Sequence, residues 1–68
     1  MAGSVARVTE ISATSDTSFE DAIKVGIDRA TQTLRGVKSG WVKEQEVLLG
    51  DNGVTGYKVN LLITFVLE

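Results

Sequence analysis

The stretch that decides the fold is GYKVNLLITFVLE, residues 56–68. Every second residue of it is apolar: Tyr57, Val59, Leu61, Ile63, Phe65 and Leu67. Successive side chains of a strand point to opposite faces, so this period of two predicts a β-strand with one buried face, over residues 54–67. The opposite parity also carries Leu62 and Val66. The strand is therefore expected to need cover on both of its faces.

A hairpin precedes this strand. GDNG, residues 50–53, contains Asn52-Gly53, a pair that tolerates the positive φ angles of a tight turn. Residues 41–49, WVKEQEVLL, lie before the turn and are predicted to form the strand that pairs with it.

Residues 18–35 carry the pattern of an amphipathic helix. Its apolar residues recur at i, i+3 and i+4 and continue to Val37: Phe19, Ala22, Ile23, Gly26, Ile27, Ala30, Leu34 and Val37. Thr17 and Glu20 fit a capping box, in which the Thr17 hydroxyl accepts from a backbone amide of the first turn while Glu20 reaches back. Gly36 suits the left-handed residue that follows a helix.

The N-terminal segment completes the architecture. Residues 5–13, VARVTEISA, are rich in β-branched side chains and predict a first strand, and residues 14–18 form a polar break. The expected fold is α+β with the order βαββ, one helix packed on a three-stranded antiparallel sheet. It forms a single domain over residues 1–68, in which residues 1–4 are expected to be flexible. Because one helix covers one face, Leu62 and Val66 should lie on the uncovered face, where exposed apolar area usually marks an interface.

Composition restricts the function. The 68 residues contain no cysteine and no histidine, so the chain has no disulfide and none of the usual zinc ligand sets. Seven basic and nine acidic side chains give a net charge of −2, which offers no basic stripe for nucleic acid and no polybasic patch for a membrane. No apolar run approaches the length of a membrane span. We expect a soluble cytoplasmic protein that gains stability as a homo-oligomer, because so short a chain has little core.

The order of elements and several motifs resemble the dodecin family. VTEISATSDTSFEDAI is similar to the opening of that family, where a strand and a Thr-Ser turn lead into a helix that starts Ser-(Phe/Trp)-Glu. DRATQTLR, VKEQ and GYKVNLLITFVLE resemble its helix end, its second strand and its closing strand. The match runs from Val5 to Glu68. The resemblance implies trimers that assemble into hollow dodecamers, many of which bind flavins between subunits for storage or photoprotection and not for catalysis.

The resemblance also implies where a flavin would bind, and three of those positions differ here. The family's stacking tryptophan after the helix corresponds to Ser39, which has no aromatic face. The glutamine after the closing-strand tyrosine is Lys58, which donates hydrogen bonds but cannot accept them. The basic residue that often follows Glu-Gln in bacterial members is Glu46, which would repel a phosphate. The usual flavin site is thus predicted to be degraded.

Trp41, the single tryptophan, has two interpretations. It lies two residues beyond Ser39, so the two side chains should share a face about 6.6 Å apart, from the rise of ~3.3 Å per strand residue. A riboflavin, FMN or FAD ring could then bind in a shifted pocket between the Trp41 side chains of two subunits. The favoured interpretation is an anchor at a subunit interface, where tryptophan is enriched. Gln45 is predicted on the same face as Ser39 and Trp41, as a polar contact.

No constellation predicts catalysis. Glu44 and Glu46 share a strand face, but this spacing is common by chance, and Asp51-Asn52 is explained by its turn. No metal site is predicted. Two hypotheses remain: a non-catalytic assembly that binds another small ligand, an ion or nothing, and a flavin-binding or storage protein that uses Trp41. The cofactor stays unknown.

Overall fold

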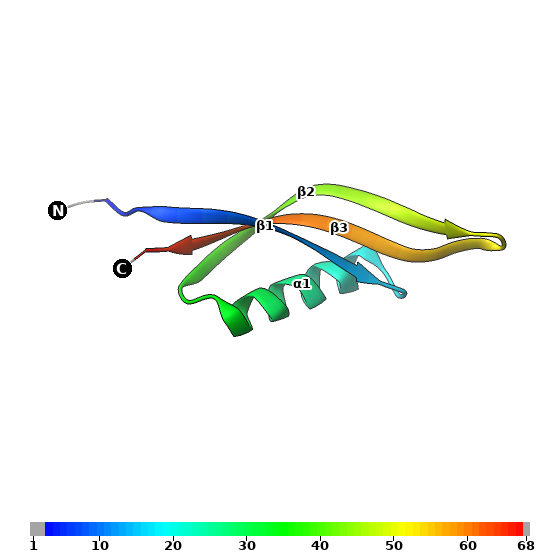
Figure 1. Cartoon of the computed structure of the whole chain (residues 1–68), viewed down its shortest axis with the longest axis horizontal. Helices are drawn as coiled ribbons and strands as arrows, with labels where there is room; N and C mark the ends of the chain where they lie inside the picture. The colour runs from blue at the N-terminus through cyan, green and yellow to red at the C-terminus, as the bar shows by residue number, and fades with distance from the viewer. Residues whose placement is uncertain (1–2, 68) are drawn as a thin grey trace.

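The computed structural model describes residues 3–67 and contains four elements: β1 (Ala6–Ser15), α1 (Phe19–Thr33), β2 (Val37–Gly50) and β3 (Gly53–Val66). The strands form one antiparallel sheet in the order β1-β3-β2, and α1 lies along one face of it (Figure 1). The α+β fold of order βαββ is confirmed. We call the face under α1 the helix face and the opposite one the open face. The flexibility predicted for residues 1 and 2 lies outside the described residues.

The cap of α1 is a serine, not the threonine that the sequence pattern favoured. The Ser18 side chain accepts a hydrogen bond from the Asp21 amide at 2.9 Å. Ser15, which is buried, donates to the Asp21 carboxylate at 2.6 Å and accepts from the Thr17 amide at 2.9 Å. The Thr17 hydroxyl bonds only to Asp16. The predicted capping box of Thr17 and Glu20 is therefore wrong by one residue. The hydrogen bonds of Ser15 to Asp21 and Thr17 position the chain so that Ser18 is the N-cap.

The helix passes directly into β2. Leu34 is the C-cap, and its backbone N–H donates a hydrogen bond to the Ala30 carbonyl at 2.9 Å; Gly36 has φ of +70°, as predicted. The reversal at Gly36 is so tight that Val37 already pairs with Phe65. Val37 thus belongs to the sheet and not to the helix, and β2 begins four residues before the predicted start at residue 41. β1 likewise runs past its predicted end at residue 13, since Thr14 and Ser15 pair with β3.

Cross-strand register assigns each side chain to a face, because residues opposite each other share one. Three rows on the helix face are Ala13–Val59–Gln45, Ile11–Leu61–Val42 and Thr9–Ile63–Gly40. Four rows on the open face are Val8–Thr64–Ser39, Glu10–Leu62–Trp41, Ser12–Asn60–Glu44 and Thr14–Lys58–Glu46. β2 has a β-bulge between Val42 and Glu44, where Lys43 is the extra residue. This bulge reverses the alternation for the rest of β2.

The core is small and lies between α1 and the sheet. Its large, fully buried side chains are Val59, Leu61 and Ile63, from the predicted buried face of β3. The helix contributes small buried residues at a spacing of four, namely Ala22, Gly26 and Ala30, so its backbone lies close to the sheet. Partly buried side chains surround this centre: Ile11, Phe19, Ile23, Ile27, Leu34, Val37 and Val42.

The chain is unusually extended for its size. The sheet reaches beyond both ends of α1, and the overall dimensions are 57 × 19 × 14 Å (Figure 1). The radius of gyration is 14.3 Å, whereas about 11 Å is typical of a compact domain of this length. The accessible surface is 5126 Å², against about 4,200 Å² for a compact monomer of 7.3 kDa. A single chain therefore leaves excess surface exposed.

Candidate functional site

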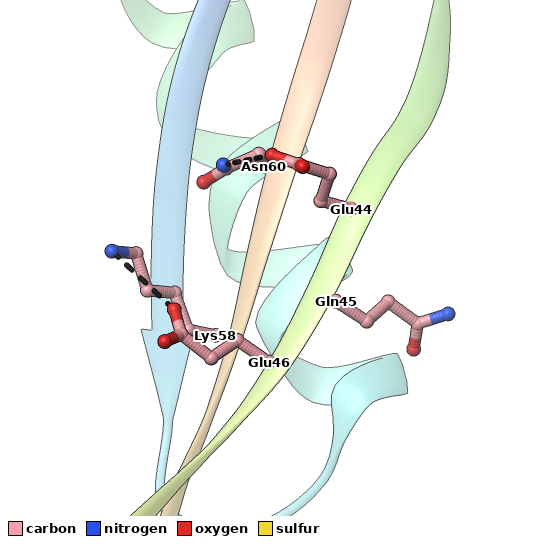
Figure 2. A pocket seen from close by; sticks show the side chains of 5 residues that line it. All are labelled: Glu44, Gln45, Glu46, Lys58 and Asn60. Carbon is pink, nitrogen blue, oxygen red and sulfur yellow. Dashed lines mark hydrogen bonds and ion pairs between the residues drawn. The ribbon is translucent and has the colours of Figure 1, made fainter.

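The centre of the open face is polar, and its side chains are paired across the strands. Asn60 donates to the Glu44 carboxylate at 3.1 Å, and the Lys58 ammonium lies 3.8 Å from the Glu46 carboxylate (Figure 2). These pairs follow from the register, since Glu44 lies opposite Asn60 and Glu46 opposite Lys58. Two of the three positions at which the chain departs from the flavin-site pattern, Glu46 and Lys58, therefore neutralise each other.

A second ion pair crosses the sheet beside this region. The Lys43 ammonium lies 3.3 Å from the Glu10 carboxylate, which joins the two outer strands across β3. Lys43 can reach Glu10 because it is the bulged residue of β2. The row of Glu10 also contains Leu62, and Leu62 is half-buried even though α1 lies on the other face.

A half-open cavity of about 330 Å³ lies over these pairs. Glu44, Gln45, Glu46, Lys58 and Asn60 line it. Four of the side chains lie on the open face, whereas Gln45 points away from them (Figure 2). The cavity is thus polar, with acceptors in excess of cationic donors.

The prediction that Gln45 shares a face with Ser39 and Trp41 is wrong. Gln45 lies opposite Val59 on the helix face, whereas Ser39 and Trp41 lie opposite Thr64 and Leu62 on the open face. The alternation of β2 was counted without the bulge at Lys43, which moves Gln45 to the other side. The same bulge brings Glu44 and Glu46 to the face of Trp41.

Trp41 is the most exposed large apolar side chain of the open face. It is 73% exposed on an edge strand, next to Leu62 of β3. Ser39 lies in the next row, so the expected common face of Ser39 and Trp41 is confirmed by the register. An indole this exposed loses most of the benefit of burial and commonly marks a contact surface.

One chain does not bring all the predicted site residues together. Ser39 lies opposite Thr64, and Lys58 is six residues away along β3, which corresponds to about 20 Å. Trp41 lies opposite Leu62, about 13 Å from Lys58 by the same rise. A ligand that touches both Trp41 and Lys58 of one chain would therefore have to span about 13 Å, and a shorter ligand could contact both only between chains.

The charges of the polar centre leave one net negative charge. Three carboxylates, of Glu10, Glu44 and Glu46, face two ammonium groups, of Lys43 and Lys58. Within residues 3–67, no three acidic side chains gather closely enough to hold a metal ion. In the same range, no helix has the length and apolarity needed to cross a bilayer.

Asn60 and the Glu10–Lys43 pair are the site residues that sequence reasoning missed. The turn at Asp51-Asn52 joins the paired residues Gly50 and Gly53, so counting back from the turn would suggest partners for each residue of β3. Regular pairing counted from the turn is correct only as far as Leu49 and Val54. Beyond them Thr55 is an extra residue of β3, and further along Lys43 is an extra residue of β2. The bulges carry no residue signature of their own in this sequence.

The arrangement of elements and the sequence place the chain in a known family. The family model of Dodecin matches residues 5–68. A curated dodecin from Thermus thermophilus is 38% identical over 66 residues, which cover 97% of this chain and 96% of the relative. The chain therefore belongs to the dodecin family.

Solved structures agree with this assignment. A Thermus thermophilus protein of known crystal structure superposes with a TM-score of 0.90 at 38% identity, over 97% of each chain. Dodecin from Streptomyces davaonensis gives a TM-score of 0.92 at 33% identity, over 98% of each chain. A calcium dodecin from Mycobacterium tuberculosis, described as a calcium-chelating antigen with a novel calcium-binding site, gives 0.84 at 29% identity, over 96% of this chain and 93% of that one.

Proposed function

We propose that the protein is a non-catalytic binding protein that works as a homo-oligomer, with its ligand sites between subunits. The observation that carries this proposal is the surface of the single chain, which exceeds that of a compact monomer by nearly a quarter: 5126 Å² against about 4,200 Å² for 7.3 kDa. Exposed large apolar side chains, including Trp41 and Leu49, contribute to this surface. Burial of such surface at about 25 cal/mol per Å² is the strongest general driving force for association.

The proposed assembly is the one that dodecin membership implies, in which trimers assemble into a hollow dodecamer. Two features of the chain support contacts between copies on the open face. Leu62 and Trp41 form an apolar pair there, and Ser39 and Lys58 lie about 20 Å apart within one chain.

The ligand, in this proposal, is not held at the usual flavin site. Ser39 offers no ring for stacking, and the Glu46–Lys58 pair occupies the positions of a basic side chain and a glutamine. Stacking on an aromatic ring contributes about 0.5–1.5 kcal/mol beyond area burial, so its loss alone weakens flavin binding several-fold. The net negative polar centre further disfavours the phosphates of FMN and FAD. A different small ligand, an ion or no ligand at all fits these residues better.

A second candidate function is favoured by one specific observation. Trp41 lies on the open face, one row from Ser39, and presents a largely exposed indole. Two such rings from neighbouring copies would sandwich a flat ligand, which makes a shifted flavin pocket the alternative to an interface anchor.

The test combines native mass with visible absorption of the protein purified from cells. The proposal predicts an oligomer without a bound chromophore, and riboflavin or FMN titrated with micromolar protein should keep its fluorescence. A compact monomer would contradict the assembly. A yellow protein, or quenching of flavin together with Trp41 emission, would favour the second candidate function instead.

A further inference from the structure

The hairpin that joins β2 and β3 projects beyond the rest of the chain and has exposed apolar side chains. We call residues 48–55 the hairpin arm. The N-terminal end of α1 packs against the base of the arm through Phe19 and Tyr57, whose rings lie edge to face with centroids 5.1 Å apart, and the arm continues past this contact (Figure 1). Leu49 and Val54 pair across the arm and are 71% and 52% exposed. A two-stranded ribbon with exposed apolar residues is marginally stable by itself, so a partner surface would stabilise it.

A groove of matching character lies elsewhere on the same chain. It runs between α1 and the outer edge of β1, encloses about 590 Å³, and we call it the β1–α1 groove. Its apolar lining includes Ile11, Ala13, Val25 and Ala30, and Arg29 lies on its helix side. β1 pairs only with β3, so among the described residues its other edge is unpaired beside this groove. Proteins normally cover a ten-residue strand edge of this kind.

The charges at the two places are complementary. Asp51 lies in the turn at the tip of the arm, and it forms no ion pair within residues 3–67. Arg29 is exposed and likewise forms no ion pair in that range. An arm that brought Leu49 and Val54 into the groove would carry Asp51 toward the groove's only basic side chain.

We propose that the hairpin arm of one copy docks into the β1–α1 groove of the next copy, with Asp51 against Arg29. The arm and the groove are different surfaces of the chain, so the contact is head-to-tail, and such contacts close into rings when the rotation permits. This inference rests on the proposed homo-oligomer and specifies one of its contacts. The partner is a second copy of this chain.

Charge reversal tests the pairing of the two residues. Asp51→Arg or Arg29→Asp alone should raise the protein concentration at which the oligomer half-dissociates by at least about tenfold, because like charges then face each other. The double variant should return to within about threefold of the wild type. Asp28→Arg, an exposed helix position outside the groove, is the matched control and should behave as the wild type.

Cysteine crosslinking tests the geometry independently, because the chain has no native cysteine. A variant with both Asp51→Cys and Arg29→Cys, treated with a short bifunctional thiol reagent, should give a ladder of covalent multimers on a denaturing gel. An equal mixture of the two single variants should give dimers only.

The outcomes separate this inference from the proposed function. If the wild type is an oligomer but the reversals have no effect and the ladder is absent, the docking of the arm is wrong and the homo-oligomer stands. Covalent multimers together with unchanged dissociation of the charge-reversal variants would support the docking. They would also show that the ion pair of Asp51 and Arg29 does not contribute to it. A wild type that is monomeric overturns both proposals.

Discussion

Gly26 determines how closely α1 approaches the sheet. A Cβ atom at this position would lie 2.7 Å from Leu61 Cδ1 and 3.1 Å from Ala13 Cβ. The first contact is with a side chain that is itself buried, and the second is with an atom fixed to the backbone of β1. The glycine is therefore required for space, and its low helix propensity is the cost of the close packing.

The variant Gly26→Ala should lower the free energy of unfolding by up to about 2 kcal/mol, because an overpacking cost of about 1–3 kcal/mol exceeds the gain in helix propensity of about 1 kcal/mol. Denaturant unfolding at fixed protein concentration measures the change. Gln32→Ala, on the exposed side of α1, is the control and should be neutral or slightly stabilising. A clear gain in stability for Gly26→Ala would contradict the packing argument.

Ser18 and Thr17 are neighbouring hydroxyl residues of which only one caps α1. Ser18→Ala removes the acceptor of the Asp21 amide and should destabilise the fold by about 1 kcal/mol. Thr17→Ala removes only an exposed contact to Asp16 and should cost much less, within about 0.5 kcal/mol. Thermal unfolding of the two variants side by side provides the measurement. Equal losses would mean that the capping assignment is wrong.

At the scale of elements, the sequence predicted which segments are helix and strand but not how β2 is phased. The strict alternation of β3 and the turn sequence GDNG at residues 50–53 determine a hairpin, and the spacing of small and apolar residues determines α1. The bulge at Lys43 could not be predicted, since it arises from local backbone geometry and the sequence VKEQ permits either alternation. For that reason the common face predicted for Ser39 and Trp41 is correct, whereas the prediction that Gln45 shares it is wrong.

The hydrogen-bond partners near the start of α1 could not be predicted from the sequence, for a similar reason. Thr17 and Ser18 both suit an N-cap, and the choice depends on Ser15 and Asp21, which meet only after β1 and α1 are packed. The extent of β1 and β2 also exceeds the sequence patterns, because pairing with the long β3 extends both strands.

The open face offers a test of the degraded flavin site. Ser39→Trp, Glu46→Arg and Lys58→Gln together would provide an aromatic ring, a cation for a phosphate and a side chain that both donates and accepts. We expect the triple variant to bind FMN at least about fivefold more tightly than the wild type, because one ring stack alone contributes about 1 kcal/mol. Fluorescence quenching of FMN measures the affinity.

A control variant distinguishes a restored flavin site from a nonspecific increase in FMN binding. The variant with Glu46→Arg and Lys58→Gln but with Ser39 retained should bind FMN more weakly than the triple variant. If neither variant binds better than the wild type, the three positions do not determine flavin binding in this chain.

At the scale of the whole molecule, the extended shape and the small core make association part of stability. Val59, Leu61 and Ile63 are the large side chains that are fully buried, so within residues 3–67 little apolar surface is removed from water by one chain. The unfolding temperature of such a protein depends on the protein concentration. The apolar area that one folded chain leaves exposed is covered only in the oligomer, and dissociation exposes it again.

Leu62→Lys should therefore shift the oligomer toward smaller species and lower the unfolding temperature. The lysine would place a charge directly beside Trp41 and remove the apolar contact of Leu62 with it on the open face. Native mass spectrometry over a dilution series gives the size distribution. Thr31→Lys, on the exposed side of α1, should leave both properties unchanged, and an unchanged oligomer in Leu62→Lys would show that this row is not an interface.

Trp41 reports on the same event without any substitution. Because the indole is 73% exposed in one chain, we expect its emission to shift to longer wavelength on dilution, with a midpoint equal to that of dissociation by mass. Emission that stays constant while the oligomer dissociates would mean that Trp41 lies outside every subunit contact.

The extra residue in the middle of β2 decides which side chains line the polar cavity. Lys43 lies outside the regular alternation, which puts Glu44 and Glu46 on the open face and Gln45 on the helix face. If Lys43 instead paired with Asn60 in regular alternation, Gln45 would turn outward and the two carboxylates would face the apolar core. The place of the bulge along the strand, and not only the identity of the residues, is thus a route by which such a scaffold can exchange two acidic groups for an amide and acquire a new ligand.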